Sequence, residues 1–161
     1  YEVDLPAEGG DVRPMHARAL DVAAVLDLAT TVGACERVIE MTVEHAKDRQ
    51  QFGRPIGSFQ AVAHRCVDMR TELDACRYLA LWAAWALDRD EPADLQVGAA
   101  KAYADGAFRR LIGHAHQVHG AIGFSTEHDL HRFTRRVKAF ELSHGTTAPA
   151  LERVAVAMGL Q

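Results

Sequence analysis

The fold is decided where the chain turns between its two longest helical segments, at DRQQFGRPIGSFQ, residues 48–60. Gly53, Pro55 and Gly57 favour a turn, and Ser58 stands where it would cap the start of a following helix. This stretch therefore predicts that one long helix ends near Gln51, reverses direction and is followed by a second long helix that packs beside it.

The same stretch carries more chemistry than a connection between helices needs. A cation, two amides and two aromatic rings are placed where two helix ends meet, and a helix N-terminus adds partial positive charge there. Such a set suits a planar ligand that bears phosphate. The alternative is that the rings fill the end of a bundle while the polar groups cap helices. The residues concerned are Arg49, Gln51, Phe52, Phe59 and Gln60.

Apolar residues recur at alternating steps of three and four along three segments, at about residues 20–51, 59–87 and 92–119. This spacing keeps one face of each helix against its neighbours at shallow crossing angles. The stripes are Val25, Leu28, Val32, Cys35, Ile39, Thr42 and Ala46; then Phe59, Val62, Cys66, Met69, Leu73, Cys76, Ala80, Ala83 and Leu87; then Val97, Ala100, Ala104, Ala107, Leu111, His114 and Val118.

After the third stripe the sequence GAIGFS breaks the helical pattern. Ser125 or Thr126 is expected to cap a fourth helix at about residues 127–143, and a short last helix is expected at about 149–158. The pattern predicts an all-α fold, an up-down four-helix bundle with a short extra C-terminal helix. Residues 1–18 lack helical periodicity and are expected to precede the bundle domain of residues 19–161.

Several residues lie off the stripes or are polar members of them. Trp82 and Trp85 lie beside the second stripe, which indicates a second buried face against another domain or subunit. His114 is expected to be a hydrogen-bonded histidine of the core. Arg136 and Lys138 are expected to belong to a solvated basic face of the fourth helix.

The composition limits the partners and the compartment. With 161 residues and 48% hydrophobic residues, the chain can form one globular domain. Its net charge is −4, so neither nucleic acid nor an anionic membrane is expected as a partner. Cys35, Cys66 and Cys76 fall on apolar helix faces, as reduced thiols of a cytoplasmic protein would. No apolar run reaches transmembrane length.

Three common kinds of site find little support in the sequence. A di-iron bundle needs Glu-x-x-His pairs on two helices, and only Glu141 and His144 have that spacing. No serine occupies a nucleophile elbow, and the chain contains neither a G-x-G-x-x-G sequence nor a P-loop. We expect no metal, and a nucleotide would not be bound through a Rossmann crossover.

The pattern R-x-Q-F-G-x-P-I-x-x-F-Q of residues 49–60 resembles the signature in the C-terminal helical domain of acyl-CoA dehydrogenases. The resemblance continues through His64 and Met69, and again at QVHGAIGF, residues 117–124. It covers roughly residues 20–160. It implies that residues 1–18 are a linker or the tail of a preceding β-domain. Because the chain starts at Tyr1 rather than Met, we also expect it to be part of a longer protein.

The resemblance implies FAD as cofactor, held between subunits. Residues of the family that correspond to the hinge reach the pyrophosphate and adenosine part of the neighbouring subunit's FAD, and a second segment approaches the same cofactor. Ala121 stands where the family has Gly. The implied contacts are Arg49, Gln51, Phe52, Ile56, Phe59 and Gln60, then Gln117, Val118, Gly120 and Ala121, and finally Thr146.

The catalytic base of the family has no obvious counterpart. Many members carry a Glu directly before Gly-Thr in the last interhelical loop, where this chain has His144. Other members carry it early in the first helix, at the position of Ala23, and Ala24 stands where some have an Arg that serves CoA. Asp21 and Asp27 lie two and four residues out of register. A neutral His could act as base near pH 7.

The implied function is FAD contact and subunit packing in a flavin-dependent acyl-CoA dehydrogenase, with an acyl-CoA substrate and an electron-transfer flavoprotein as partners. A homo- or hetero-oligomer, dimer or tetramer, is expected. One alternative is a non-catalytic partner subunit of a heteromeric enzyme, as in bacterial sterol side-chain degradation, which the run at residues 130–136 resembles. Another is a flavin monooxygenase or oxidase of the same fold. The chain alone is expected to be inactive.

Overall fold

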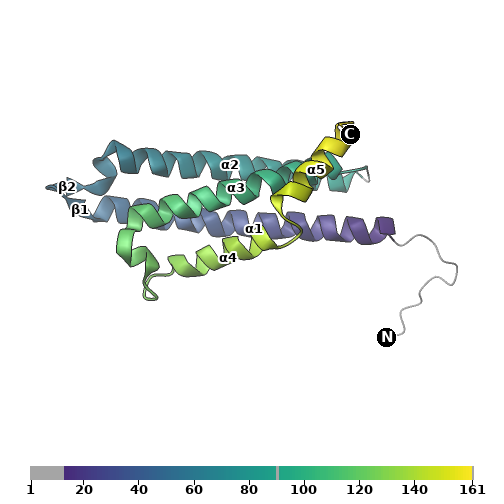
Figure 1. Cartoon of the computed structure of the whole chain (residues 1–161). Helices are drawn as coiled ribbons and strands as arrows, with labels where there is room; N and C mark the ends of the chain where they lie inside the picture. The colour runs from purple at the N-terminus through teal and green to yellow at the C-terminus, as the bar shows by residue number, and fades with distance from the viewer. Residues whose placement is uncertain (1–12, 90, 161) are drawn as a thin grey trace.

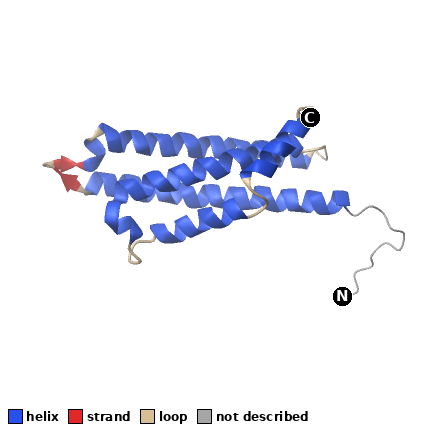
Figure 2. Ribbon diagram, in the orientation of Figure 1, coloured by secondary structure: helices blue, strands red, loops and turns tan. Residues whose placement is uncertain are grey.

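The computed structural model describes residues 13–89 and 91–160, and side chains from Met15 onward. Within these residues it is a bundle of helices with one very short hairpin (Figures 1 and 2). The predicted all-α bundle is confirmed. The helices are α1 (Arg13–Asp48), α2 (Gln60–Asp88), α3 (Asp94–His119), α4 (Leu130–Leu142) and α5 (Thr147–Ala157), with 3-10 turns η1 (Ile56–Ser58) and η2 (Gly120–Phe124) and strands β1 (Gln50–Gln51) and β2 (Arg54–Pro55).

The core lies where α1, α2 and α3 run side by side (Figure 1). All residues of the first predicted stripe are buried, and so are those of the second from Met69 onward. Of the third predicted stripe, on α3, all residues are buried except the half-buried His114. Its Nδ1 lies 3.0 Å from the Arg65 guanidinium, as predicted for a hydrogen-bonded histidine of the core. Cys35 and Cys76 are fully enclosed and Cys66 is half-buried. The three-four spacing thus identified the core correctly.

The two shorter helices cover the other side of α1 and α3. Helix α4 packs against both, and α5 crosses α3 near its start. Gly98 permits this crossing, because a Cβ there would lie 2.9 Å from Val154 Cγ2 and 3.0 Å from the carbonyl oxygen of Ala150. The last helix therefore sits closely over α3 only because residue 98 has no side chain.

Some helix ends differ from the predicted ones. Helix α1 already begins at Arg13, so residues 13–18 of the expected preceding segment are helical, and residues 1–12 lie outside the described part. Ser58 does not cap α2: its hydroxyl donates to the carbonyl of Pro55 at 2.7 Å, and Phe59 is the N-cap residue. Helix α4 begins only at Leu130, because Ser125 accepts the amide of Glu127 in a turn before it.

The outer face of α2 carries the two tryptophans. Trp82 and Trp85 are 38% and 54% exposed, and the Arg89 guanidinium lies 4.9 Å from the Trp85 ring centre. The second buried face expected from them therefore stays a prediction about a larger assembly. Among the described residues, the helices are all too short or too polar to cross a bilayer.

Candidate functional site

The hinge between α1 and α2 is a two-residue β-hairpin that projects from the end of the bundle (Figures 1 and 2). Gln50 pairs with Pro55 and Gln51 with Arg54, and the turn residues Phe52 and Gly53 have φ of 53° and 75°. Tight hairpins favour positive φ at both turn residues, usually supplied by Asn-Gly or Gly-Gly. A bulky residue in this conformation is strained, and such strain is concentrated at functional sites.

The strained residue also exposes its ring. Phe52 is 92% exposed, and its ring centre lies 6.1 Å from that of Phe59 in an edge-on arrangement. The Arg54 guanidinium lies over Phe59, 4.1 Å from the ring centre. The two aromatic rings thus form an open surface with a cation beside it. Arg54 is not among the contacts predicted from the sequence. The only signal for it there is its position two residues after Phe52, across the turn glycine.

Arg49 lies at the base of this hairpin with an exposed side chain. Its main chain is fixed, because its amide donates to His45 at 2.9 Å and its carbonyl accepts the amide of Ile56 at 2.8 Å. Its guanidinium makes no hydrogen bond or ion pair with any described residue. Gln51 and Gln60 are exposed as well, whereas Ile56 is half-buried. The hairpin therefore offers an unpaired cation to a ligand outside the chain.

The second predicted segment lies at the C-terminal end of α3. Gln117 and Gly120 line a surface depression of about 380 Å³ together with Gly113, His116 and Phe124. The rings of His116 and Phe124 stack at 4.5 Å. The neighbouring Ala121 is exposed. The side chain of Val118 is buried in the bundle, so it is not available to a ligand.

A row of three histidine rings joins the two segments, the first pair stacked and the second pair edge-on. The ring of His45, one turn before Arg49, lies 4.7 Å from that of His119, which in turn lies 4.7 Å from that of His128. Burial lowers the pKa of His45 and His119, and the neighbouring imidazoles lower it further. The structure therefore brings the hairpin and the Gln117–Ala121 segment to the same end of the bundle (Figure 1).

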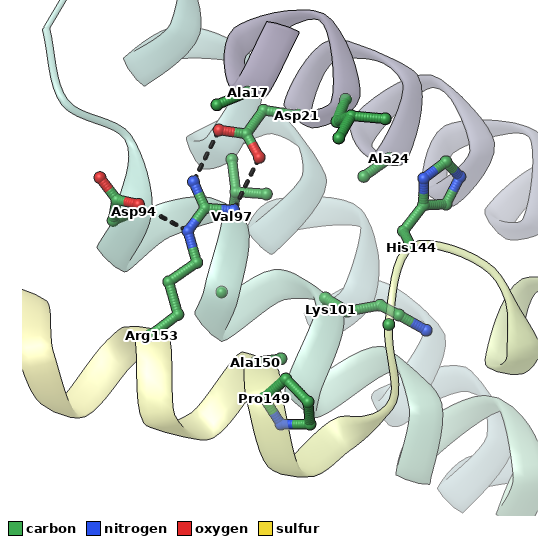
Figure 3. Close-up of a pocket in the computed structure, with 13 residues that line it drawn as sticks. Ala17, Asp21, Ala24, Asp94, Val97, Lys101, His144, Pro149, Ala150 and Arg153 are labelled. Carbon is green, nitrogen blue, oxygen red and sulfur yellow. Dashed lines mark hydrogen bonds and ion pairs between the residues drawn. The ribbon is translucent and has the colours of Figure 1, made fainter. Parts of the chain in front are cut away.

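A cavity of about 530 Å³ lies far from this end, between the N-terminal half of α1, the start of α3, the loop after α4, and α5 (Figure 3). Arg153 spans it. Its guanidinium donates to both carboxylate oxygens of Asp21 at 2.6 Å and to Asp94 at 2.7 Å, and these bonds raise the pKa of Arg153. The carboxylate of Asp21 is therefore already neutralised.

His144 stands at the edge of this cavity beside Ala24 (Figure 3). Its φ is 58°, a second strained non-glycine residue. Its Nε2 lies 3.5 Å from Oδ2 of Asp27, and Asp27 also forms an ion pair with Arg136 of α4. The predicted solvated role of Arg136 is wrong, because packing of α4 on α1 brings it to Asp27. Lys138 is solvent-exposed as expected, paired with Glu141.

Thr146 is the predicted contact that the structure separates from the others. It is the N-cap residue of α5 and follows two residues that line the cavity. Ala24, also at the cavity, precedes the end of α1 at Asp48 by 24 residues, which corresponds to about 36 Å of helix. Thr146 therefore lies near the cavity, at the opposite end of the bundle from the hairpin. Among the described residues, no group of three His, Cys, Asp or Glu side chains is arranged to hold a metal ion.

Comparison with known proteins identifies the family. Residues 14–159, nearly the whole described chain, match the model of the acyl-CoA dehydrogenase C-terminal domain. The chain therefore belongs to the acyl-CoA dehydrogenase family and represents its C-terminal domain.

Three individual matches illustrate the relationship. The chain is 40% identical over 116 residues to the acyl-CoA dehydrogenase IpdE2 of Mycobacterium tuberculosis, a match over 72% of this chain and 35% of that protein. It is similar to a chain of the ChsE4-ChsE5 complex from the same organism, with a TM-score of 0.82 and 34% identity over 88% of this chain and 39% of the other. PigA with FAD and proline gives a TM-score of 0.81 and 31% identity over 88% and 37%. The chain spans little more than a third of the curated relatives.

Proposed function

We propose that this chain is the C-terminal domain of a flavin-dependent acyl-CoA dehydrogenase, which desaturates an acyl-CoA thioester between its α and β carbons. In this proposal it contacts FAD through the hairpin and packs subunits together. The observation that carries the proposal is the hairpin itself, in which a strained, exposed Phe52 stands beside an unpaired Arg49. The similarity to PigA, whose structure contains FAD, supports the choice of cofactor.

The hairpin residues fit the dinucleotide part of FAD. The guanidinium of Arg49 presents a planar fork of donors, which suits a diphosphate. Phe52 and Phe59 offer ring faces and edges to a planar adenine, and Gln117 at the neighbouring depression can hydrogen-bond to the same molecule. When bound, FAD would supply the acceptor for the hydride lost from the substrate. The protein residues at this end bind and orient; they are not placed to move a proton of the substrate.

The flavin bound by the hairpin belongs, in this proposal, to a neighbouring subunit. The cavity at His144 lies about 36 Å along α1 from the hairpin, so one flavin ring cannot occupy the cavity while its adenine lies at the hairpin of the same chain. The hairpin also points away from its own bundle (Figure 1). The proposed function therefore needs an oligomer. In the same proposal acyl-CoA is the substrate, an electron-transfer flavoprotein accepts the electrons, and the protein is cytoplasmic.

The test replaces Arg49 by Ala in the full-length protein and measures FAD per subunit by absorbance after gel filtration. Losing a charge-assisted contact to phosphate should weaken flavin retention by about 1.5–3 kcal/mol, roughly 10- to 150-fold. Arg132→Ala is the matched control, because Arg132 is an exposed arginine outside the hairpin that pairs with Asp129 of its own segment. Equal flavin content in the Arg49→Ala protein and the wild type would sink the assignment.

A second candidate is a non-catalytic partner subunit of a heteromeric dehydrogenase. It is favoured by the N-terminal half of α1, where Ala23 and Ala24 stand at the positions of the family's base and CoA-serving arginine, and where Asp21 and Asp27 are each held by an arginine. The similarity to a chain of the ChsE4-ChsE5 complex agrees with it. One assay separates the two candidates. A catalytic dehydrogenase, purified at full length without any homologous partner, turns over an acyl-CoA by itself. A non-catalytic subunit gives turnover only when the homologous partner is added.

A further inference from the structure

Two buried ring nitrogens at the hairpin end of the bundle have no hydrogen-bond partner among the described residues. They are Nε2 of His119 and Nδ1 of His116. Buried polar atoms are nearly always paired, because leaving one unpaired costs free energy, so each exception needs a reason. His119 is only 5% exposed and lies in the row of three histidine rings beneath the two predicted ligand-binding segments. The proposed function gives these rings no role.

The hydrogen bonds of the two rings determine which nitrogen carries a hydrogen. A carbonyl oxygen can only accept, so Nδ1 of His119 donates to the carbonyl of Ala115 at 2.8 Å. The hydroxyl of Thr134 donates to the carbonyl of Leu130, so it accepts from Nε2 of His116 at 2.8 Å. In a neutral imidazole the other nitrogen is then a bare lone pair. Each of the two unpartnered nitrogens can therefore accept a proton.

The surroundings keep the row neutral when no ligand is bound. Burial lowers the pKa of His45 and His119, and the neighbouring imidazoles lower it further. The guanidinium of Arg49 also lowers the pKa of His45. Among the described side chains, the ionisable groups that face these two rings are Asp48 and Arg49 at the end of α1, His116 of α3 and His128 of the loop before α4. Asp48 is the one anion in this set, so the row lacks negative charge.

A diphosphate bound at Arg49 would supply that negative charge. The amide of Arg49 donates to the carbonyl of His45 at 2.9 Å, so the two residues lie one helical turn apart. Side chains at that spacing are neighbours, about 6 Å apart at Cβ. The two phosphate groups would neutralise the guanidinium and add negative charge, which favours the protonated form of a nearby imidazole. The pKa of His45 and of His119 should therefore rise when the anion binds.

We propose that the row of His45, His119 and His128 takes up a proton when the diphosphate of FAD binds at Arg49, so that flavin binding is linked to pH. This rests on the proposed flavin-binding function. The proton comes from the solvent and is held on an imidazole nitrogen, and no covalent bond of the flavin changes. The complex then holds more protons than the separated protein and FAD. Affinity for FAD should therefore increase as the pH falls from 7.5 to 6.0.

The experiment titrates the flavin-stripped full-length protein with FAD in a calorimeter at pH 6.5. It is done in PIPES and in Bis-Tris, two buffers that release protons with different enthalpies, so the difference between the two heats gives the number of protons bound per FAD. About 0.3–0.6 proton is expected, which corresponds to roughly two- to four-fold tighter binding for each pH unit lowered. FAD has no group that titrates between pH 6.0 and 7.5, so the proton taken up is held by the protein.

Two variants each remove one ring of the row and keep a polar side chain. In His45→Gln and in His119→Gln, proton uptake should fall by about half or more while FAD still binds, because the rings titrate as a coupled set. His16→Gln is the matched control. His16 is an exposed histidine on the same helix, 29 positions and about 44 Å before His45, and its replacement should leave the uptake unchanged. Near-UV circular dichroism checks that each variant is folded.

The outcomes separate this proposal from the function on which it rests. If the wild type binds FAD with equal heats in the two buffers, the row takes up no proton and the proposal is overturned, while FAD binding at the hairpin stands. Proton uptake that both folded variants retain in full would overturn it equally, because the proton would then be held elsewhere. If the stripped wild type binds no FAD at all, the flavin function itself fails and the proton linkage with it.

Discussion

Replacing Phe52 by Asn should stabilise the flavin-free protein and yet weaken its hold on FAD. Phe52 has φ of 53° at the first turn position of the hairpin. The left-handed conformation costs an ordinary L-residue about 1–2 kcal/mol, whereas Asn adopts it readily and is the preferred residue there. The side chain is 92% exposed, so little buried area is lost with it. The edge contact with Phe59 offsets part of the gain, about 0.5 kcal/mol.

The expected balance is a gain of about 0.5–1.5 kcal/mol in the free energy of unfolding of the apoprotein. Affinity for FAD should change in the opposite direction. Stacking of a base on an aromatic side chain contributes about 1–3 kcal/mol, so loss of the ring should weaken binding roughly 5- to 150-fold. Urea unfolding of the stripped full-length protein measures the first quantity, and titration of the same protein with FAD measures the second.

Phe52→Tyr is the matched control, because it keeps both the ring and the backbone strain. It should retain FAD and show no gain in stability. The reasoning is refuted if Phe52→Asn lowers the stability of the apoprotein. In that case the ring would support the hairpin rather than a ligand, and the strain at Phe52 would carry no functional meaning.

Two further predictions concern the bundle itself. Lys101→Met should lower the free energy of unfolding by about 3–5 kcal/mol, because it leaves the buried carboxylate of Asp105 without its opposite charge. Lys138→Met, at an exposed lysine, should lower it by less than about 1 kcal/mol. Equal urea midpoints for the two variants would contradict this. Burial lowers the pKa of His45 and His119, so the unfolded chain binds more protons than the folded one below about pH 6.5, and stability should fall as the pH decreases from 7.5 to 5.5. His119→Gln should reduce that loss, and urea midpoints that do not change with pH would show the idea to be wrong.

The helices could be predicted from the sequence because their signal is repeated many times. Seven residues of the first stripe, from Val25 to Ala46, predict the same buried face of one helix, and all seven are buried. The end of α3 at His119 followed equally well from the glycine after it. Where the evidence was a single residue, prediction was less accurate. Ser58 looked like a cap, but its hydroxyl was taken by the turn that precedes the helix.

The site could be predicted only where it is local in sequence. The motif of residues 49–60 predicts a ligand contact at the hinge, which stays a prediction. Two-residue strands carry no periodicity, so neither the hairpin nor the strained conformation of Phe52 could be predicted from the motif. The Asp27–Arg136 pair joins residues 109 positions apart, and nothing in either neighbourhood indicates the other. The sequence around Arg136 therefore predicts only a surface charge. Only the packing of α4 against α1 reveals that it holds the carboxylate beside His144.

The distance between the two sites has a consequence for assembly under the proposed function. The hairpin and the cavity are separated by about 36 Å of one helix, and each carries only part of what a flavin and a thioester require. The hairpin has an unpaired cation and aromatic rings, whereas the described cations that line the cavity, Lys101 and Arg153, are both paired with carboxylates. A complete active site must then combine the cavity of one subunit with the hairpin of another. Dissociating the oligomer should therefore release FAD even though every residue of the bundle remains folded.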